Sequence, residues 1–123
     1  MKILIADDDP NILIILKRVL QKNKHEILAA KDGQEAVDFF NKEHPDLAVL
    51  DINMPQLTGW DVLHEIRLKN KTFPVILLTV QTGLKDQIKG YNEQADYYLS
   101  KPFEPALLLA YVHRCENKIK KTS

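Results

Sequence analysis

Short apolar runs alternate with stretches of helical periodicity along the whole chain. Three of the runs are almost continuously apolar, which is typical of parallel strands buried on both faces. Two others are shorter or more mixed. The strands that this pattern predicts lie at residues 2–6, 26–30, 47–51, 74–79 and 96–100.

Each predicted strand is followed by a stretch in which apolar residues recur every three or four positions, as on one face of a helix. The first begins at Asp9-Pro10, an N-cap followed by proline at the first helical position. Further helices are predicted at 34–43, 59–70 and 84–91, and a last one after residue 104. The buried stripe of the first comprises Ile12, Ile15, Leu16, Val19 and Leu20, and that of the last comprises Leu108, Val112, Cys115 and Ile119.

Five successive strand–helix units with short polar connections predict an α/β fold. Such units build a doubly wound, parallel five-stranded sheet with helices on both faces, a three-layer sandwich. A length of 123 residues fits one domain, 1–123. Ligands of such sheets bind outside the carboxyl ends of the strands, so these ends are where functional residues are expected.

Composition narrows the class of protein. The chain has 17 Lys and Arg against 17 Asp and Glu, and this balance argues against direct nucleic-acid binding. The lone Cys115 permits no internal disulfide and suits a reducing compartment. The first apolar run ends too early for a signal peptide, and no run reaches a membrane span. We therefore expect a cytoplasmic protein without membrane attachment.

Polar residues stand at four of the predicted strand ends. Two carboxylates about 4 Å apart repel each other by roughly 4 kcal/mol at an effective dielectric near 20, so a run of three needs water or a positive partner. Mg²⁺ prefers a few carboxylates and retains several waters. The four ends carry Asp7, Asp8 and Asp9; Asp51; Thr79; and Lys101 before Pro102.

Each of these residues has an ordinary structural interpretation when taken alone. Asp9 is a helix N-cap, a threonine that ends a strand is a common β-branched residue, and a lone lysine is usually solvated. Their coincidence at the same edge of the predicted sheet favours a magnesium site.

Four segments, in this order and spacing, resemble the receiver domain of two-component response regulators. They read "ADDD" from residue 6, "AVLDINMPQLTG" from residue 48, "VILLT" from residue 75 and "DYYLSKPF" from residue 96. The resemblance covers essentially the whole chain. It implies a flavodoxin-like (βα)5 fold with strand order 2-1-3-4-5.

The resemblance also implies a signalling switch rather than an enzyme. Asp51 would accept a phosphoryl group from a histidine kinase or a histidine phosphotransfer protein, and Lys101 would contact that group. The chain would catalyse only its own phosphorylation and dephosphorylation. The magnesium ligands would be Asp7, Asp8, Asp51 and the backbone carbonyl of Asn53.

In this family the switch couples a hydroxyl to an aromatic ring. Thr79 would move toward the modified Asp51, and Tyr98 would turn inward into the vacated space. The Lys101–Pro102 bond is expected to be cis. Signalling would proceed by protein–protein contact through the fourth helix, the fifth strand and the fifth helix.

The chain departs from the family pattern at three positions. Val80 stands where a small residue is usual and would narrow access for small phosphodonors. Gln94 replaces a usual glycine, and Thr58 replaces a frequent aspartate.

The predicted contact face also differs from that of the DNA-binding subfamily, which pairs charged residues there. Here the corresponding positions are Tyr97, Leu107 and Tyr111, so we expect an exposed apolar patch and a weak homodimer or a partner contact through it.

Two other classes remain open at this point. A haloacid-dehalogenase-type Mg²⁺-dependent phosphatase would need a second aspartate at position 53, where the chain has Asn53. A flavin mononucleotide carrier would need a phosphate-binding loop after the first strand. The carboxylates found there would repel a phosphate group. No output domain is expected within these 123 residues, so the chain is expected to be either a stand-alone regulator or a receiver from a longer protein. The kinase and the output partner are not identified by the sequence.

Overall fold

The computed structural model describes residues 1–80 and 94–122. The predicted helix at 84–91 lies outside the described residues. The described elements are β1 (Lys2–Ala6), α1 (Pro10–Gln21), β2 (Glu26–Ala30), α2 (Gly33–Glu43), β3 (Leu47–Asp51), α3 (Gly59–Lys69), β4 (Val75–Thr79), β5 (Tyr97–Ser100) and α5 (Pro105–Thr122).

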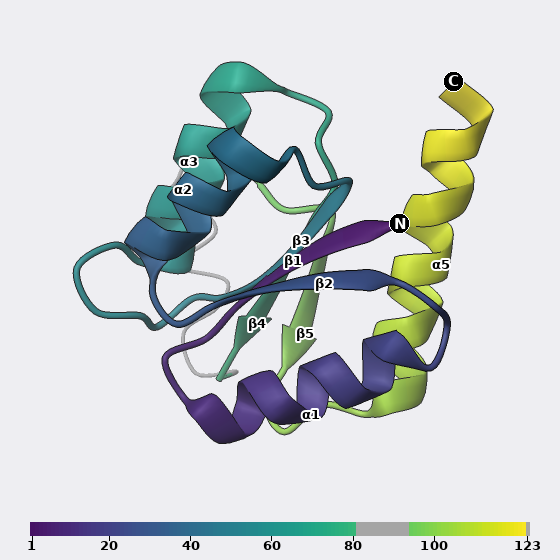
Figure 1. The fold of residues 1–123 in the computed structure, drawn as a ribbon, viewed down its shortest axis with the longest axis horizontal. Coiled ribbons are helices and arrows are strands. Elements are labelled where there is room, and N and C mark those ends of the chain that lie inside the picture. The colour runs from purple at the N-terminus through teal and green to yellow at the C-terminus, as the bar shows by residue number, and fades with distance from the viewer. Residues whose placement is uncertain (81–93, 123) are drawn as a thin grey trace.

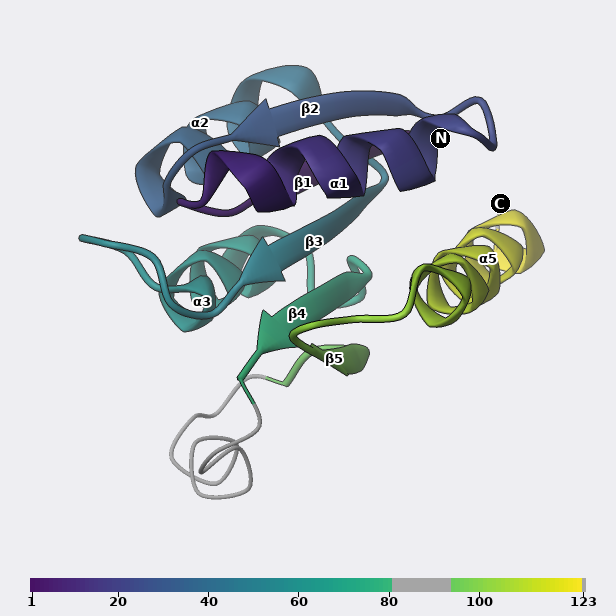
Figure 2. The same cartoon turned by 90° about the horizontal axis from the view of Figure 1, so that it is seen from below.

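The five strands form one parallel sheet with the order β2-β1-β3-β4-β5. Figure 2 shows β2 at one edge and β5 at the other. Helices α1 and α5 cover one face and α2 and α3 cover the other, which gives three layers (Figure 1). The predicted flavodoxin-like topology is confirmed.

Alternation along the central strands divides the core into two halves. Ile3 and Ile5 of β1 pack in the cluster with α1 and α5, whereas Leu4 and Ala6 pack with α2 and α3. All four side chains are fully buried, and the residues of β3 and β4 are buried as well. Successive side chains on a strand point to opposite faces, and helices cover both faces of this sheet.

Side chains cap the helices that follow the strands. Asp9 is the N-cap of α1, as predicted, and accepts a hydrogen bond of 2.9 Å from the Asn11 N–H. Thr58 caps α3 and forms a reciprocal capping box with Asp61. The cap fixes where α3 begins, directly after the loop that follows Asp51.

Some details of the prediction were wrong. Ile15 was placed on the buried stripe of α1, but its side chain is 45% exposed, because the stripe that faces the sheet is narrower and runs through Leu16, Val19 and Leu20. Ile119 on α5 is only half-buried. Strands β4 and β5 each begin one residue later than predicted, at Val75 and Tyr97.

Within residues 1–80 and 94–122, no helix combines the length and the apolar character that a membrane span requires.

Gly59 offers a test of how closely α3 packs on the end of β3. A Cβ atom at this position would lie 2.5 Å from the Asp51 carbonyl oxygen and 2.8 Å from the Ile52 Cα. Both are backbone atoms that cannot move aside cheaply, so we expect Gly59→Ala to lower the free energy of unfolding by about 2–3 kcal/mol. Urea unfolding measures the change.

The matched control is Gln34→Ala, at an exposed position in the first turn of α2, for which a change within about 0.5 kcal/mol is expected. A Gly59→Ala protein as stable as the parent would show that the helix can shift away from β3 without cost.

Candidate functional site

Carboxylates from two neighbouring central strands meet where the carboxyl ends of the strands lie. We call this end of the sheet the carboxyl edge, and it is distinct from the outer strands β2 and β5. Asp7 directly follows β1, and Asp51 is the last residue of β3, which pairs with β1. Carboxylate oxygens of Asp7, Asp8 and Asp51 lie within 4.8 Å of one another. Asp7 and Asp51 are buried, whereas Asp8 is exposed, so the cluster has two buried carboxylates and one at the surface.

Lys101 reaches this cluster from the segment after β5. Its Nζ lies 2.8 Å from Asp7 Oδ2 and 3.1 Å from Asp51 Oδ1. The bond between Lys101 and Pro102 is cis. One ammonium group therefore bridges the two buried carboxylates, which would otherwise repel each other at short range.

Two backbone N–H groups hold the carboxylates in place. The Asp9 N–H donates to Asp7 Oδ1 at 2.9 Å, and the Asn53 N–H donates to Asp51 Oδ1 at 3.2 Å. In both cases the donor lies two residues after the acceptor, at the start of the following loop. The loops thus orient the carboxyl groups toward the carboxyl edge.

Burial and the neighbouring charges shift the pKa values of Asp51 and Lys101. Burial raises the pKa of Asp51 to about 6, and the neighbouring Asp7 carboxylate adds to this, although bonds from Lys101 and the Asn53 N–H oppose it. Burial alone would lower the pKa of Lys101, but its bonds to Asp7 and Asp51 raise that pKa above its ordinary value. The ammonium therefore stays charged at neutral pH.

The donor set fits a small divalent cation. Three carboxylates face one ammonium, which leaves an excess of negative charge at the carboxyl edge. Oxygen donors with an exposed member suit Mg²⁺, which binds through few carboxylates and keeps waters. The structure brings Asp7, Asp8 and Asp51 together, and the Asn53 N–H lies within hydrogen-bond distance of Asp51.

Thr79 ends β4, the strand beside β3. Its side chain is buried, and its hydroxyl donates to the Val80 carbonyl oxygen at 2.8 Å. The hydroxyl is thus engaged with its own loop in this structure. Val80 is 51% exposed at the carboxyl edge.

Tyr98 lies on the face of the sheet that α2 and α3 cover, where its ring packs partly against the core. Its ring centroid is 6.1 Å from that of Trp60, and its hydroxyl oxygen accepts a hydrogen bond of 3.1 Å from the Ala95 N–H. No role was predicted for Trp60 from the sequence. A large aromatic residue in the first turn of the helix after Asp51 was the signal that was available.

The predicted apolar contact face is smaller than expected. Tyr97 and Tyr111 are half-buried, and their rings stack on each other with centroids 4.4 Å apart and an angle of 10° between planes. Both also pack against the core. Leu107 is 41% exposed. Aromatic stacking within the molecule therefore uses ring surface that we had expected to be available to a partner.

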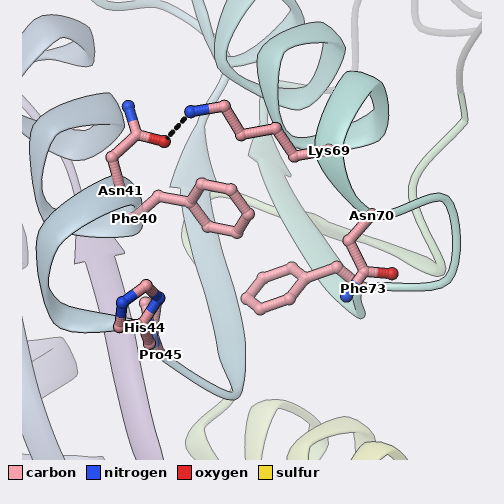
Figure 3. Close-up of a pocket in the computed structure, with 7 residues that line it drawn as sticks. All are labelled: Phe40, Asn41, His44, Pro45, Lys69, Asn70 and Phe73. Atoms are coloured by element: carbon pink, nitrogen blue, oxygen red, sulfur yellow. Dashed lines mark hydrogen bonds between the residues drawn. The ribbon is translucent and has the colours of Figure 1, made fainter.

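A cavity of about 390 Å³ lies at the opposite end of the strands, between the ends of α2 and α3. Figure 3 shows the rings of Phe40 and Phe73 meeting edge to face on its floor, with the Lys69 ammonium donating to the Asn41 side-chain oxygen above them. The carboxyl-terminal ends of α2 and α3 carry partial negative charge and favour a cation there. The lining already supplies a positive charge of its own, that of Lys69. The lining therefore specifies no single class of ligand. It comprises Phe40, Asn41, His44, Pro45, Lys69, Asn70 and Phe73.

Comparison with known proteins agrees with this geometry. Residues 3–113 match the response regulator receiver domain. The chain is 46% identical over 114 residues to the "Probable transcriptional regulator ycf27" of Galdieria sulphuraria, covering 93% of this chain and 44% of that protein. It is 36% identical over 104 residues to the alkaline phosphatase synthesis transcriptional regulatory protein PhoP of Bacillus subtilis, covering 85% of this chain and 43% of that protein.

A solved response regulator receiver domain from Clostridium thermocellum superposes with a TM-score of 0.91 at 31% identity, covering 99% of this chain and 98% of that one. The chain spans about half the length of the curated relatives that it matches. With a receiver-domain match over nearly its whole length and an acidic cluster at the carboxyl edge, the chain belongs to the receiver domain family of two-component response regulators.

Proposed function

We propose that this receiver domain is a switch that accepts a phosphoryl group on Asp51. The observation that carries the proposal is the arrangement around that carboxylate. Asp51 lies buried at the end of a central strand, within reach of two further carboxylates and one ammonium group. No other cluster of metal-ligating side chains of this kind occurs in the described part of the chain.

In the proposed reaction, an Asp51 carboxylate oxygen attacks the phosphorus atom of a phosphohistidine. The new O–P bond forms as the N–P bond breaks, and the histidine nitrogen keeps the electron pair. Both reactants are negatively charged, so positive charge must offset their repulsion. Lys101 supplies one such charge beside Asp51.

Asp7, Asp8, Asp51 and the backbone carbonyl of Asn53 are the groups that would hold Mg²⁺. A bound Mg²⁺ ion supplies further positive charge and orients phosphoryl oxygens. Asp7 is already oriented by the Asp9 N–H, and Asp51 by the Asn53 N–H.

The proposed output begins at Thr79. A phosphoryl group on Asp51 would offer new acceptor oxygens, and the Thr79 hydroxyl would exchange its bond to the Val80 carbonyl for one of them. Movement of this loop would free space into which Tyr98 turns. A local change of charge would thereby bias a two-state element of the fold.

The proposed donor is a histidine kinase or a histidine phosphotransfer protein in the cytoplasm. The relatives named above are transcriptional regulators about twice as long as this chain, so a fused output domain is one proposed route for the signal. Contact or weak self-association through Tyr97, Leu107 and Tyr111 stays a prediction of the sequence.

The first prediction is that Asp51 takes up one phosphoryl group and that the reaction requires Mg²⁺. Intact-mass measurement after incubation with phosphorylated histidine kinases should show a single added phosphate on the parent protein. Asp51→Asn, or chelation of Mg²⁺, should abolish it. Phosphate on both proteins in equal amount would assign the reaction to another residue.

The second prediction concerns Asp8, the exposed carboxylate of the cluster. Mg²⁺ should stabilise the parent protein by about 2.7 kcal/mol when its concentration is about a hundred times the dissociation constant. Asp8→Ala should remove this gain and should leave the metal-free protein as stable as the parent or more so, since like-charge repulsion is relieved. Melting curves with and without Mg²⁺ measure both effects.

Asp9→Ala provides a contrasting control in that experiment. It removes the N-cap of α1, which costs about 1 kcal/mol, but it leaves the three clustered carboxylates in place, so the response to Mg²⁺ should persist. An Asp8→Ala protein with the full response to Mg²⁺ would exclude Asp8 as a ligand.

The third prediction uses the raised pKa of Asp51. The pKa of this carboxyl is about 6 in the folded protein rather than 3.8, so folding favours its protonated form. The contribution of Asp51 to the free energy of unfolding is therefore fully present below pH 3.8. It is lost as the pH rises through 6 and the buried group ionises. The side-chain amide introduced by Asp51→Asn cannot ionise, so at about pH 7.5 without metal this variant should be more stable by about 3 kcal/mol.

Urea unfolding of both proteins from about pH 4 to about pH 8 measures this difference, which should fall to about 0.5 kcal/mol at the acidic end. A difference that does not depend on pH would show that packing, rather than ionisation of Asp51, separates the two proteins.

A further inference from the structure

Arg67, near the end of α3, contacts three acceptors that belong to different segments of the chain. Its guanidinium donates to the Phe73 carbonyl oxygen, to the Gln94 carbonyl oxygen at 3.2 Å, and to Asp96 Oδ2 at 3.3 Å. Its side chain is only 13% exposed. A planar guanidinium with several fixed donors suits such a junction, which a single ammonium group cannot reproduce.

Asp96 fixes the guanidinium from the side of the sheet. Its Oδ2 atom also accepts a hydrogen bond of 2.8 Å from the Val75 N–H, and its own N–H donates to the Val75 carbonyl oxygen at 2.9 Å. Its Oδ1 atom lies 3.8 Å from the Lys118 ammonium on α5. Arg67 is therefore held by a carboxylate that is itself tied to the first residue of β4.

The hydrogen bond from Arg67 to the Gln94 carbonyl contacts one side of the planar peptide group that joins residues 94 and 95. The Gln94 carbonyl and the Ala95 N–H belong to the same planar peptide group and point in opposite directions. The Ala95 N–H donates to the Tyr98 hydroxyl oxygen at 3.1 Å. A continuous chain of bonds thus runs from the guanidinium through one peptide group to the Tyr98 hydroxyl, and each bond polarises the next.

The Tyr98 ring, unlike its hydroxyl, contacts the core. The ring lies beside Trp60 and packs partly among the residues under α2 and α3, while the hydroxyl at its far end is the atom that the 94–95 peptide group holds. The ring is therefore restrained at both its face and its tip. Gln94 carries a Cβ atom, which limits rotation of that peptide group more than glycine would.

We infer that Arg67 is a positioning residue for Tyr98. It orients the 94–95 peptide group, and the N–H of that group holds the Tyr98 hydroxyl in the arrangement seen while the Thr79 hydroxyl is bonded to the Val80 carbonyl. The inference rests on the proposed function only in treating Tyr98 as the moving aromatic residue. Arg67 lies at the end of the strands opposite the carboxylates, so it acts on the switch without contact with the phosphorylation site.

The test follows the Tyr98 ring and the Ala95 amide in the unphosphorylated protein. Incorporation of 3-fluorotyrosine labels all four tyrosines, and the fluorine signal that disappears in Tyr98→Phe belongs to Tyr98. In Arg67→Met this signal should move toward its value in the unfolded chain. Hydrogen exchange at the Ala95 amide should become about fivefold faster, the factor that loss of one ordinary hydrogen bond implies.

Controls separate this role from loss of stability. Arg18→Met replaces an exposed arginine on α1 and should change neither observation. If Arg67→Met only loosened the fold, exchange at Leu77 in the centre of β4 would accelerate by the same factor as at Ala95, and that result would overturn the inference. An unchanged Tyr98 signal in Arg67→Met would also overturn it.

Tyr98→Phe keeps the ring but removes the acceptor, and it serves if Arg67→Met does not fold. Exchange at the Ala95 amide should accelerate in this variant, whereas exchange at the Asp96 amide, which donates to the Val75 carbonyl, should not. Equal exchange at Ala95 in Tyr98→Phe and the parent would contradict the inference.

Beryllium fluoride, which mimics an aspartyl phosphate, separates the inference from the proposed function. If it moves the Tyr98 signal of the parent while Arg67→Met leaves that signal unchanged, the switch stands and the positioning role is refuted. If Arg67→Met moves the signal but beryllium fluoride does not, the positioning role stands and the proposed switch is refuted.

Discussion

The bridge that Lys101 makes between two buried carboxylates is the interaction on which the site depends. Asp7 and Asp51 are almost inaccessible to water, and the removal of such groups from water costs free energy unless a charge compensates them. The Lys101 ammonium lies within 3.1 Å of both carboxyl groups. One positive charge cannot neutralise three carboxylates, and the remaining negative charge makes the carboxyl edge suitable for a divalent cation.

The strand order determines which groups can meet at that edge. β1 and β3 are neighbours, so Asp7 and Asp51 lie side by side although they are far apart in the sequence. β4 and β5 follow in order on the same side of β3, and they bring Thr79 and Lys101 to the same edge. A parallel sheet thereby brings carboxylates, a hydroxyl and an ammonium group to the same ends of neighbouring strands.

The two ends of the strands carry different groups of residues. The carboxyl ends carry the charged groups of the proposed phosphorylation chemistry, whereas the amino ends of β4 and β5 carry the junction of Arg67 and Asp96. Tyr98 connects them, because its ring lies on the strand that leads to Lys101 while its hydroxyl is held by the Ala95 N–H just before that strand. In the proposed switch, a change at one end of β5 would therefore reach the other end through Tyr98.

The sequence by itself determined most of the elements and the candidate site residues at their ends. Strict apolar runs identified β1, β3 and β4, and the polar residues at their ends identified Asp7, Asp51 and Thr79, because alternation and strand length are local properties of the chain. Only the tertiary structure decided how far Ile15 is exposed, that Tyr97 and Tyr111 stack on each other, and that Arg67 reaches the Gln94 carbonyl. These outcomes depend on the angle at which each helix packs on the sheet and on contacts between residues distant in sequence, and no local periodicity encodes either.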